Sequence, residues 1–172
     1  MVSRGIINYL VADHARLHTL LDRAMETPEL DPEAFADFRR GLLRHIAIEE
    51  KVLLPAVREA RGGAPLDRAH ALRIDHAALT SLLVPTPDLA LCREILALLS
   101  EHDAKEEGRD GVYEECRRAL SDRDLAHLAR RAESFPQVRV ARHFDGPSVH
   151  RTAQEALASA RRMRAPRNVE GR

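Results

Sequence analysis

The sequence predicts an all-α protein: a four-helix bundle of up-down-up-down topology with a C-terminal helical appendage. Its hydrophobic fraction is 44%, yet only 3% of the residues are aromatic and none is Trp, so the core must consist of Leu, Ala, Val and Ile, as is typical of packed helices. Apolar residues recur at helical spacing in four successive segments. Because the breaks between them are short, neighbouring helices are expected to be antiparallel.

The first two helices have clear boundaries. The first is expected over residues 6–25, where the breaker sequence ETPELDP follows. The second has Asp31 as its N-cap and Pro32 at its first helical position, and it is expected to stop at Gly62-Gly63. Pro55 lies late in this helix and predicts a kink or an early end near the preceding residue.

The next two helices begin after prolines. The third is expected to open at Pro65 and to run through Leu83. Thr86-Pro87 gives a cap and a first-turn proline for the fourth, which should reach at least Glu107. Two glycines follow, so this helix is expected to break near Gly108 and to resume through Ala119.

The chain therefore divides into a bundle over residues 1–119 and an extension over 120–172. Residues 121–134 are expected to form a polar helix and residues 135–147 an irregular connection. Ser148 is the expected cap of a last helix that ends in an arginine-rich tail. The sequence assigns no chemistry to this extension.

The charge balance argues against several classes of partner. There are 27 basic and 27 acidic residues, so no net field favours nucleic acid or an anionic membrane. No apolar run approaches the roughly 20 residues of a membrane span, and the start MVSRGIINYL has no signal-peptide pattern; a cytoplasmic protein is expected. Cys92 and Cys116 match no CxxC spacing and are expected to be reduced packing residues. The sequence does not identify a protein partner.

Two segments spell His-x-x-x-Glu: His45 with Glu49, and His102 with Glu106. An i,i+4 pair projects from one helix face, so each segment can direct a nitrogen and an oxygen at one point. By count alone the pattern is weak, because random placement gives roughly one such pair in a chain of this composition. The position of each pair on its helix must decide.

The apolar neighbours at helical offsets show which histidines face inward. His14, His45 and His76 are surrounded on their own helix faces by aliphatic residues. His102 has such neighbours only on its N-terminal side and is expected inward, at the end of the apolar stripe. His127 lies among charged residues and is expected on the surface.

Four inward imidazoles and two inward carboxylates, Glu49 and Glu106, are costly in an apolar core. A buried carboxylate must be paired or bound to metal, since its desolvation costs several kcal/mol. The alternative is a polar network without metal, in which every member needs a partner. The segments DHARLHTLL and DHAALTSLL also resemble each other, which predicts two similar halves and two metal ions. Each ion would be bound by two or three imidazoles, Glu49 and Glu106 would bridge the two ions, and one coordination position would stay open.

In this order, the segments DHARL, HIAIEEKVLLP, DHAAL and HDAKEE resemble the hemerythrin-like HHE cation-binding family. The resemblance covers about residues 5 to 115. It implies a non-haem site with two carboxylate-bridged iron ions, and reversible oxygen binding or sensing of oxygen or iron. The ligands that the resemblance implies are His14, His45, Glu49, His76, His102 and Glu106.

The sequence departs from the family in one ligand position. Classical hemerythrins carry His-x-x-x-His on the third helix, whereas here Thr80 takes the second position and the pair His14/His18 lies on the first helix. His18 could supply a fifth nitrogen or be a hydrogen-bonded core histidine. Glu50 and Glu107 are rotated about 140° around the helix axis from the histidines of their segments, His45 and His102, so they are expected in solvent or behind the ligands.

Three functions are open at this point. The leading one is a binding protein in which oxygen or a similar diatomic enters a pocket lined by Leu17, Ile48, Leu79 and Leu99; mostly neutral imidazole ligation favours it. The second is an enzyme that acts on peroxide, oxygen or nitric oxide at the same irons. The third is a metal-free helical interaction module that acts through the arginine-rich tail. The donor set does not distinguish iron from manganese or zinc.

Overall fold

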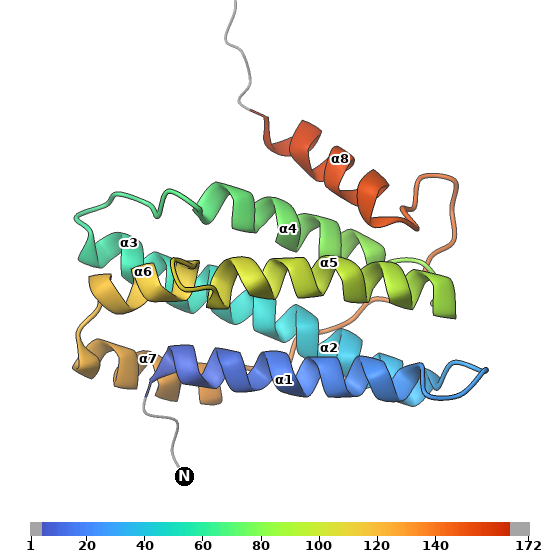
Figure 1. Cartoon of the computed structure of the whole chain (residues 1–172), viewed down its shortest axis with the longest axis horizontal. Helices are drawn as coiled ribbons and strands as arrows, with labels where there is room; N and C mark the ends of the chain where they lie inside the picture. The colour runs from blue at the N-terminus through green and yellow to red at the C-terminus, as the bar shows by residue number, and fades with distance from the viewer. Residues whose placement is uncertain (1–4, 166–172) are drawn as a thin grey trace, which may run out of the picture.

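The structure, a computed structural model, describes residues 5–165, and these form helices and connections with no strand, as predicted (Figure 1). Four long helices lie along the long axis of the molecule. They are α1 (Ile6–Ala24), α2 (Pro32–Ile48), α4 (Ala69–Leu82) and α5 (Leu89–Glu107). The turn from α1 to α2 and the turn from α4 to α5 lie at the same end of the molecule, at the right of Figure 1.

The start of α2 follows the prediction from its local sequence. The Asp31 side chain accepts hydrogen bonds from the backbone N–H groups of Glu33 and Ala34, and Pro32 occupies the first helical position. These contacts satisfy N–H groups that have no partner inside the helix.

The predicted disturbance near Pro55 takes the form of a π-helical segment, Glu49–Leu53, that continues α2 and leads into α3 (Leu54–Ala60). Within it the helix widens, so that the N–H of Leu54 donates to the carbonyl of Glu49. The helix then stops at Gly62 and Gly63, whose φ angles of 68° and 98° are those that glycine adopts readily.

Two predicted helix starts are wrong by a few residues. α4 begins at Ala69 rather than at Pro65, and α5 is capped by Asp88 rather than by Thr86. The reason for the second error is tertiary. Both the backbone N–H and the hydroxyl of Thr86 donate to Asp145 in a distant connection, at 2.8 and 2.5 Å, so Thr86 is not free to cap the helix.

The chain breaks after α5, as predicted, and forms α6 (Val112–Ala119) and α7 (Asp122–Glu133). Ser121 starts α7 with a capping box, in which the Ser121 hydroxyl accepts from the N–H of Asp124. Leu128, Ala129 and Ala132 are the buried face of this helix, which lies along α1 (Figure 1).

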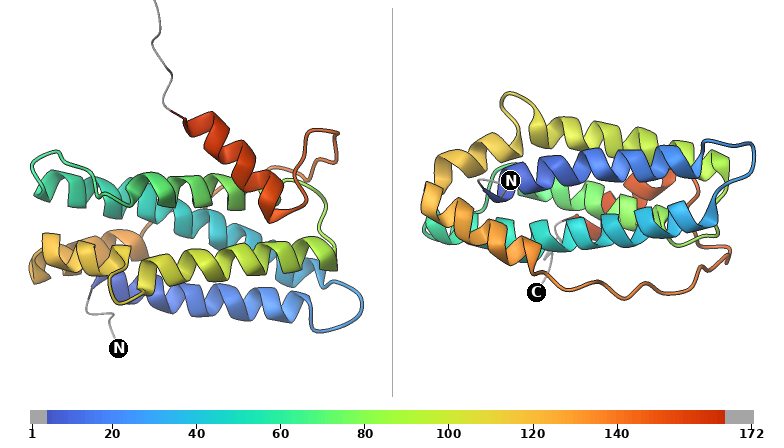
Figure 2. Two further views of the ribbon diagram at one scale, coloured as in Figure 1. Left: turned by 45° about the horizontal axis from the view of Figure 1, so that its top comes forward. Right: turned by 90° about the horizontal axis from the view of Figure 1, so that it is seen from below.

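The last helix, α8 (Ala153–Arg164), is capped by Thr152, so the prediction of Ser148 as its cap is wrong. Ser148 instead lies in a turn in which the N–H of Val149 donates to the carbonyl of Gly146. An irregular connection leads to α8, which lies against α4 (Figure 2). The final part of the arginine-rich tail, 166–172, lies outside the described residues.

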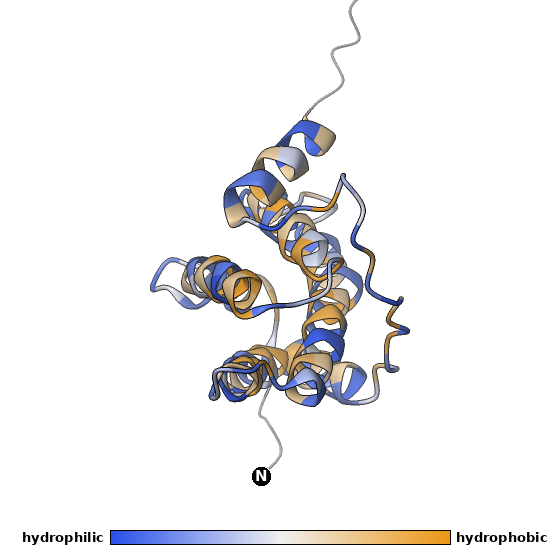
Figure 3. Cartoon of the chain, turned by 90° about the vertical axis from the view of Figure 1, so that its right-hand side faces the viewer, coloured by the Kyte–Doolittle hydropathy of each residue, from blue (hydrophilic) through white to orange (hydrophobic). Residues whose placement is uncertain are grey.

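The core consists of two apolar clusters with a buried polar layer between them. On α1, the first cluster includes Leu17 and Leu21, and the second includes Ile7 and Leu10. Helices α2 and α4 divide in the same way, whereas the buried apolar residues of α5 all belong to the first cluster. Figure 3 shows apolar colouring where the helices face one another. The buried polar residues at this level are Asp13, His14, His45, Glu49, Asp75, His76, His102, Asp103 and Glu106.

Two further observations complete the fold. Within 5–165, no helix is long and apolar enough to cross a membrane. Both cysteines, Cys92 and Cys116, are buried and unpaired, as predicted.

Candidate metal centre

Each of the four long helices contributes one histidine to the polar layer. His14 comes from α1, His45 from α2, His76 from α4 and His102 from α5, and none is more than 3% exposed. The inward orientation predicted for all four is therefore confirmed, including that of His102. Glu49 and Glu106 are completely buried beside them.

These six side chains form two overlapping groups. The first group is His14, His45, Glu49 and Glu106, and the second group is Glu49, His76, His102 and Glu106. Within each group, one nitrogen or oxygen from every residue lies within 4.8 Å of the others. The two glutamates belong to both groups, so the arrangement joins two four-donor positions through shared carboxylates.

The donor atoms converge across the helices. His14 Nε2 lies 2.9 Å from His45 Nε2 and 3.2 Å from Glu106 Oε2. His76 Nε2 lies 3.1 Å from Glu49 Oε2. The separations are those of atoms that can bind one small cation together.

The unsatisfied atoms at the centre fit a metal pair. Within the described part of the chain, Glu49 Oε2, Glu106 Oε1 and the Nε2 atoms of His76 and His102 are buried without a hydrogen-bond partner. Buried polar atoms normally have a hydrogen-bond partner, since a buried donor or acceptor without one costs about 1–3 kcal/mol. Imidazole nitrogens and carboxylate oxygens are suitable ligands for iron, manganese and zinc, so the residues fit cations of this class.

Without metal, protons compensate part of the charge. Burial raises the pKa of Glu106 well above its usual range, and the neighbouring Glu49 carboxylate raises it further. Burial opposes ionisation of Glu49 as well, but the nearby imidazoles of His45 and His76 hold its pKa well below normal. Burial would lower the pKa of His45, yet Glu49 and Asp13 raise it to about 9. Cation binding would have to displace such protons.

A carboxylate lies behind the Nδ1 atom of every histidine in the centre. A carboxylate that accepts a hydrogen bond from Nδ1–H fixes the ring and leaves the lone pair of Nε2 directed at the centre. Three rings have such a partner: Glu107 lies 2.5 Å from His14 Nδ1, Asp13 lies 3.0 Å from His45 Nδ1 and Glu50 lies 2.9 Å from His76 Nδ1. Asp75 lies 3.6 Å from His102 Nδ1, which is too far for a hydrogen bond, and this nitrogen has no hydrogen-bond partner among the described residues.

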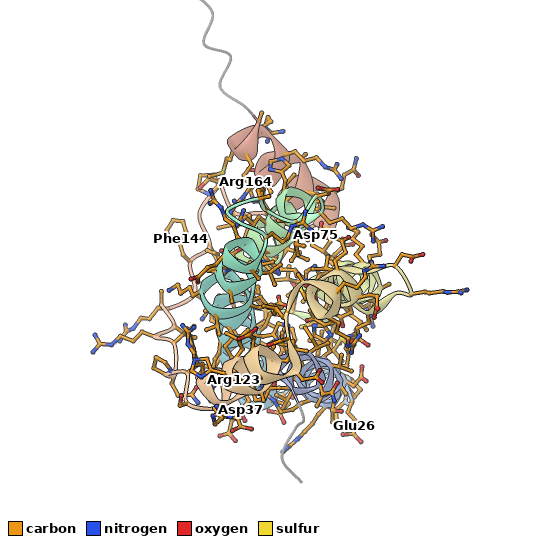
Figure 4. All side chains as sticks on the ribbon, turned by 90° about the vertical axis from the view of Figure 1, so that its left-hand side faces the viewer. Glu26, Asp37, Asp75, Arg123, Phe144 and Arg164 are labelled. Carbon is orange, nitrogen blue, oxygen red and sulfur yellow. The ribbon has the colours of Figure 1, made fainter. Side chains whose placement is uncertain are left out.

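Two of these carboxylates are themselves held by a cation. Arg16 Nε donates to Asp13 and Lys105 Nζ donates to Asp75, both at 2.7 Å. Asp75 thus lies on the side of α4 that faces α5, as Figure 4 shows. The sequence prediction missed both aspartates as partners of the rings, although the repeated Asp-His of DHARL and DHAAL was the signal for them.

Comparison with known protein families adds an independent observation. The family model of the hemerythrin HHE cation-binding domain matches residues 5–110. The chain belongs to this family. The resemblance predicted from the sequence is therefore confirmed, and all six residues of the two groups lie inside the matched segment. Comparisons with curated proteins and with solved structures find no match.

One predicted candidate of this hemerythrin-like domain lies outside both groups. His18 is 30% exposed, and its Nε2 lies 2.7 Å from Asp103 Oδ2. The other oxygen of Asp103 is buried, has no hydrogen-bond partner and lies 3.6 Å from His14 Nε2. Within residues 5–165, His18 is therefore connected to the centre through Asp103.

Tyr113 of α6, which sequence reasoning missed, also reaches the centre of the hemerythrin-like domain. Its hydroxyl donates to Glu49 Oε1 at 2.6 Å and lies 3.0 Å from Glu106 Oε2 and 3.3 Å from His14 Nε2. It is 1% exposed and lies beyond the matched segment. The turn before α6 makes this possible, because Gly111 packs so tightly on the Glu106 carbonyl that a Cβ would collide with it.

Proposed function

We propose that this protein is an up-down-up-down hemerythrin-type bundle that holds two non-haem iron ions bridged by Glu49 and Glu106, and that it binds oxygen or a similar diatomic molecule. His14 and His45 would hold one ion, and His76 and His102 the other. The observation that carries the proposal is the pair of four-donor groups that share both glutamates in a buried layer.

The choice of iron and of a binding function rests on the donor set. Four imidazoles and two carboxylates make a nitrogen-rich site, whereas the di-iron sites of ferritin-like proteins use four carboxylates with Glu-x-x-His motifs. Neutral ligands favour the ferrous state over the ferric state. When bound, a ferrous pair would supply the redox-active centre at which a diatomic molecule is taken up.

The chain contributes orientation and the exclusion of water. The carboxylates that are hydrogen-bonded to Nδ1 hold the Nε2 atoms of His14, His45 and His76 toward the centre. Leu17, Ile48, Leu79 and Leu99 are at most 1% exposed, so the core next to the polar layer is apolar. A dry apolar surrounding favours a small uncharged ligand and limits side reactions with water.

A second function is favoured by one observation. The buried hydroxyl of Tyr113 is in hydrogen-bond contact with Glu49, so it could deliver a proton to a substrate at the centre. Proton delivery is what reduction of peroxide, oxygen or nitric oxide requires. The alternative proposal is therefore a di-iron redox enzyme that acts on one of these molecules.

Spectroscopy of the iron-loaded protein distinguishes the functions. The chain is loaded with ferrous iron without oxygen and then exposed to it. For a binding protein we expect a visible absorption band that forms with oxygen and disappears when oxygen is removed. Rapid irreversible conversion to ferric iron, with continued consumption of added peroxide, would instead identify the enzyme. Failure to retain any metal would reject both and leave the metal-free module.

A further inference from the structure

The two groups of the metal centre differ in what else lies next to them. The second group has no further oxygen donor among the contacts of its histidines toward the centre in the described residues. The first group has two, the hydroxyl of Tyr113 and Oδ1 of Asp103, and both lie within 3.6 Å of His14 Nε2. The six ligands predicted from the sequence include neither of them.

Tyr113 is placed as a ligand would be. Its single hydroxyl proton can satisfy only one acceptor, yet the oxygen faces donor atoms of Glu49, Glu106 and His14 at 2.6, 3.0 and 3.3 Å. These are three of the four residues of the first group. In the described chain it makes no such contact with His76 or His102. Because Glu49 and Glu106 belong to both groups, it is the contact with His14 that places the phenol oxygen beside the first group.

Asp103 provides the second observation. The residue is 9% exposed, and its Oδ1 is buried and has no hydrogen-bond partner. His18 holds the other oxygen at 2.7 Å, which fixes the direction of Oδ1 toward His14. In the internal repeat, His45 corresponds to His102, so Ile46 corresponds to Asp103. Because Ile46 is apolar, the second group has no carboxylate equivalent to Asp103.

We propose that Tyr113 and Asp103 are oxygen ligands of the metal ion in the first group, which makes the two irons inequivalent. This inference rests on the proposed di-iron function. When the phenol binds, its O–H bond breaks, the proton passes to solvent and an iron–oxygen bond forms. Two hard anionic oxygens stabilise ferric iron. The iron of the second group keeps the open positions and is the one that accepts an external ligand.

The composition of the chain makes the test sharp. It contains two tyrosines, Tyr9 and Tyr113. The Tyr9 hydroxyl accepts a hydrogen bond from Arg44, and Arg44 belongs to neither metal group. Ferric iron bound to a phenolate gives a charge-transfer absorption and enhanced phenolate vibrations in the resonance Raman spectrum. We expect both signals in the oxidised wild-type protein. Tyr113→Phe should lose them completely, and the matched control Tyr9→Phe should keep them in full.

The wild-type spectrum decides without any variant. Two bound irons with no phenolate signal would overturn the inference and leave the di-iron proposal intact, while absence of bound iron would overturn the di-iron proposal itself. Retention of the signal in Tyr113→Phe would also contradict the inference.

Mössbauer spectroscopy tests Asp103. Two iron signals of equal area are expected in the oxidised wild-type protein, and Asp103→Asn should shift only one of them. A single signal in the wild type, or no shift in Asp103→Asn, would contradict ligation by Asp103.

Discussion

The two halves of the bundle carry the same His-x-x-x-Glu motif, but the chain follows a different course after each copy of it. In the first half, the helix continues past Glu49 through the π-helical segment Glu49–Leu53 into α3. In the second half, α5 ends one residue after Glu106, and the chain turns back so that Tyr113 enters the centre. The repeat therefore supplies the matching imidazoles and carboxylates, and the departures from it make the centre one-sided.

The largest effect is expected at the residues that the halves share. Glu49→Ala and Glu106→Ala each remove a carboxylate from both groups, so each variant should lose both irons. Iron analysis after loading gives the stoichiometry, with the exposed Glu101→Ala as control. Unchanged binding of two irons in Glu49→Ala would refute its bridging role.

The next effect separates the halves. His45 belongs to the first group and His102 to the second, so His45→Ala and His102→Ala should each reduce the iron content from two ions to one. In His102→Ala the remaining ion should keep the phenolate signal, and in His45→Ala that signal should be lost. Loss of both irons in either variant would mean that the positions do not fill independently.

The carboxylates behind the rings should have a smaller effect. Asp13 is 3.0 Å from His45 Nδ1, whereas Asp75 is 3.6 Å from His102 Nδ1. Replacing such a partner typically weakens metal binding about 10–100-fold, and we expect Asp13→Asn to weaken it more than Asp75→Asn. Competition with a chelator measures both affinities, and the reverse order would show that the hydrogen bond between Asp13 and His45 does not govern the affinity.

The smallest effect is expected for His18. Its ring contacts Asp103 and neither group directly, so His18→Gln, which can still donate to Asp103, should retain both irons. The measured quantity is again iron per chain. A fall to one iron would identify His18 as a ligand and would reverse this part of the account.

Much of the fold follows from local sequence. The Asp31-Pro32 start and the Gly62-Gly63 stop depend on side chains or φ angles inside the turn itself, and such signals can be read directly. The start of α5 could not be predicted, since Thr86 is engaged by Asp145, 59 residues away in the chain. The α8 cap was wrong because a local turn takes up Ser148.

The centre shows the same division. Helical periodicity was sufficient to predict that the four histidines and two glutamates lie close together, because each lies on the apolar stripe of its own helix. Glu50 was expected in solvent or behind the ligands, and its carboxylate lies behind His76. Tyr113 and Asp103 could not be found in this way. Tyr113 reaches the centre because the chain turns at Gly111, outside any regular helical pattern, and Asp103 is oriented by a contact with His18 of another helix.

Anomalous diffraction at the iron edge, on crystals of the ferrous-loaded chain, tests the di-iron centre most directly. We expect two iron peaks per chain, one among His14, His45, Glu49 and Glu106 and one among Glu49, His76, His102 and Glu106. A single peak, or iron bound outside these two groups, would contradict this expectation.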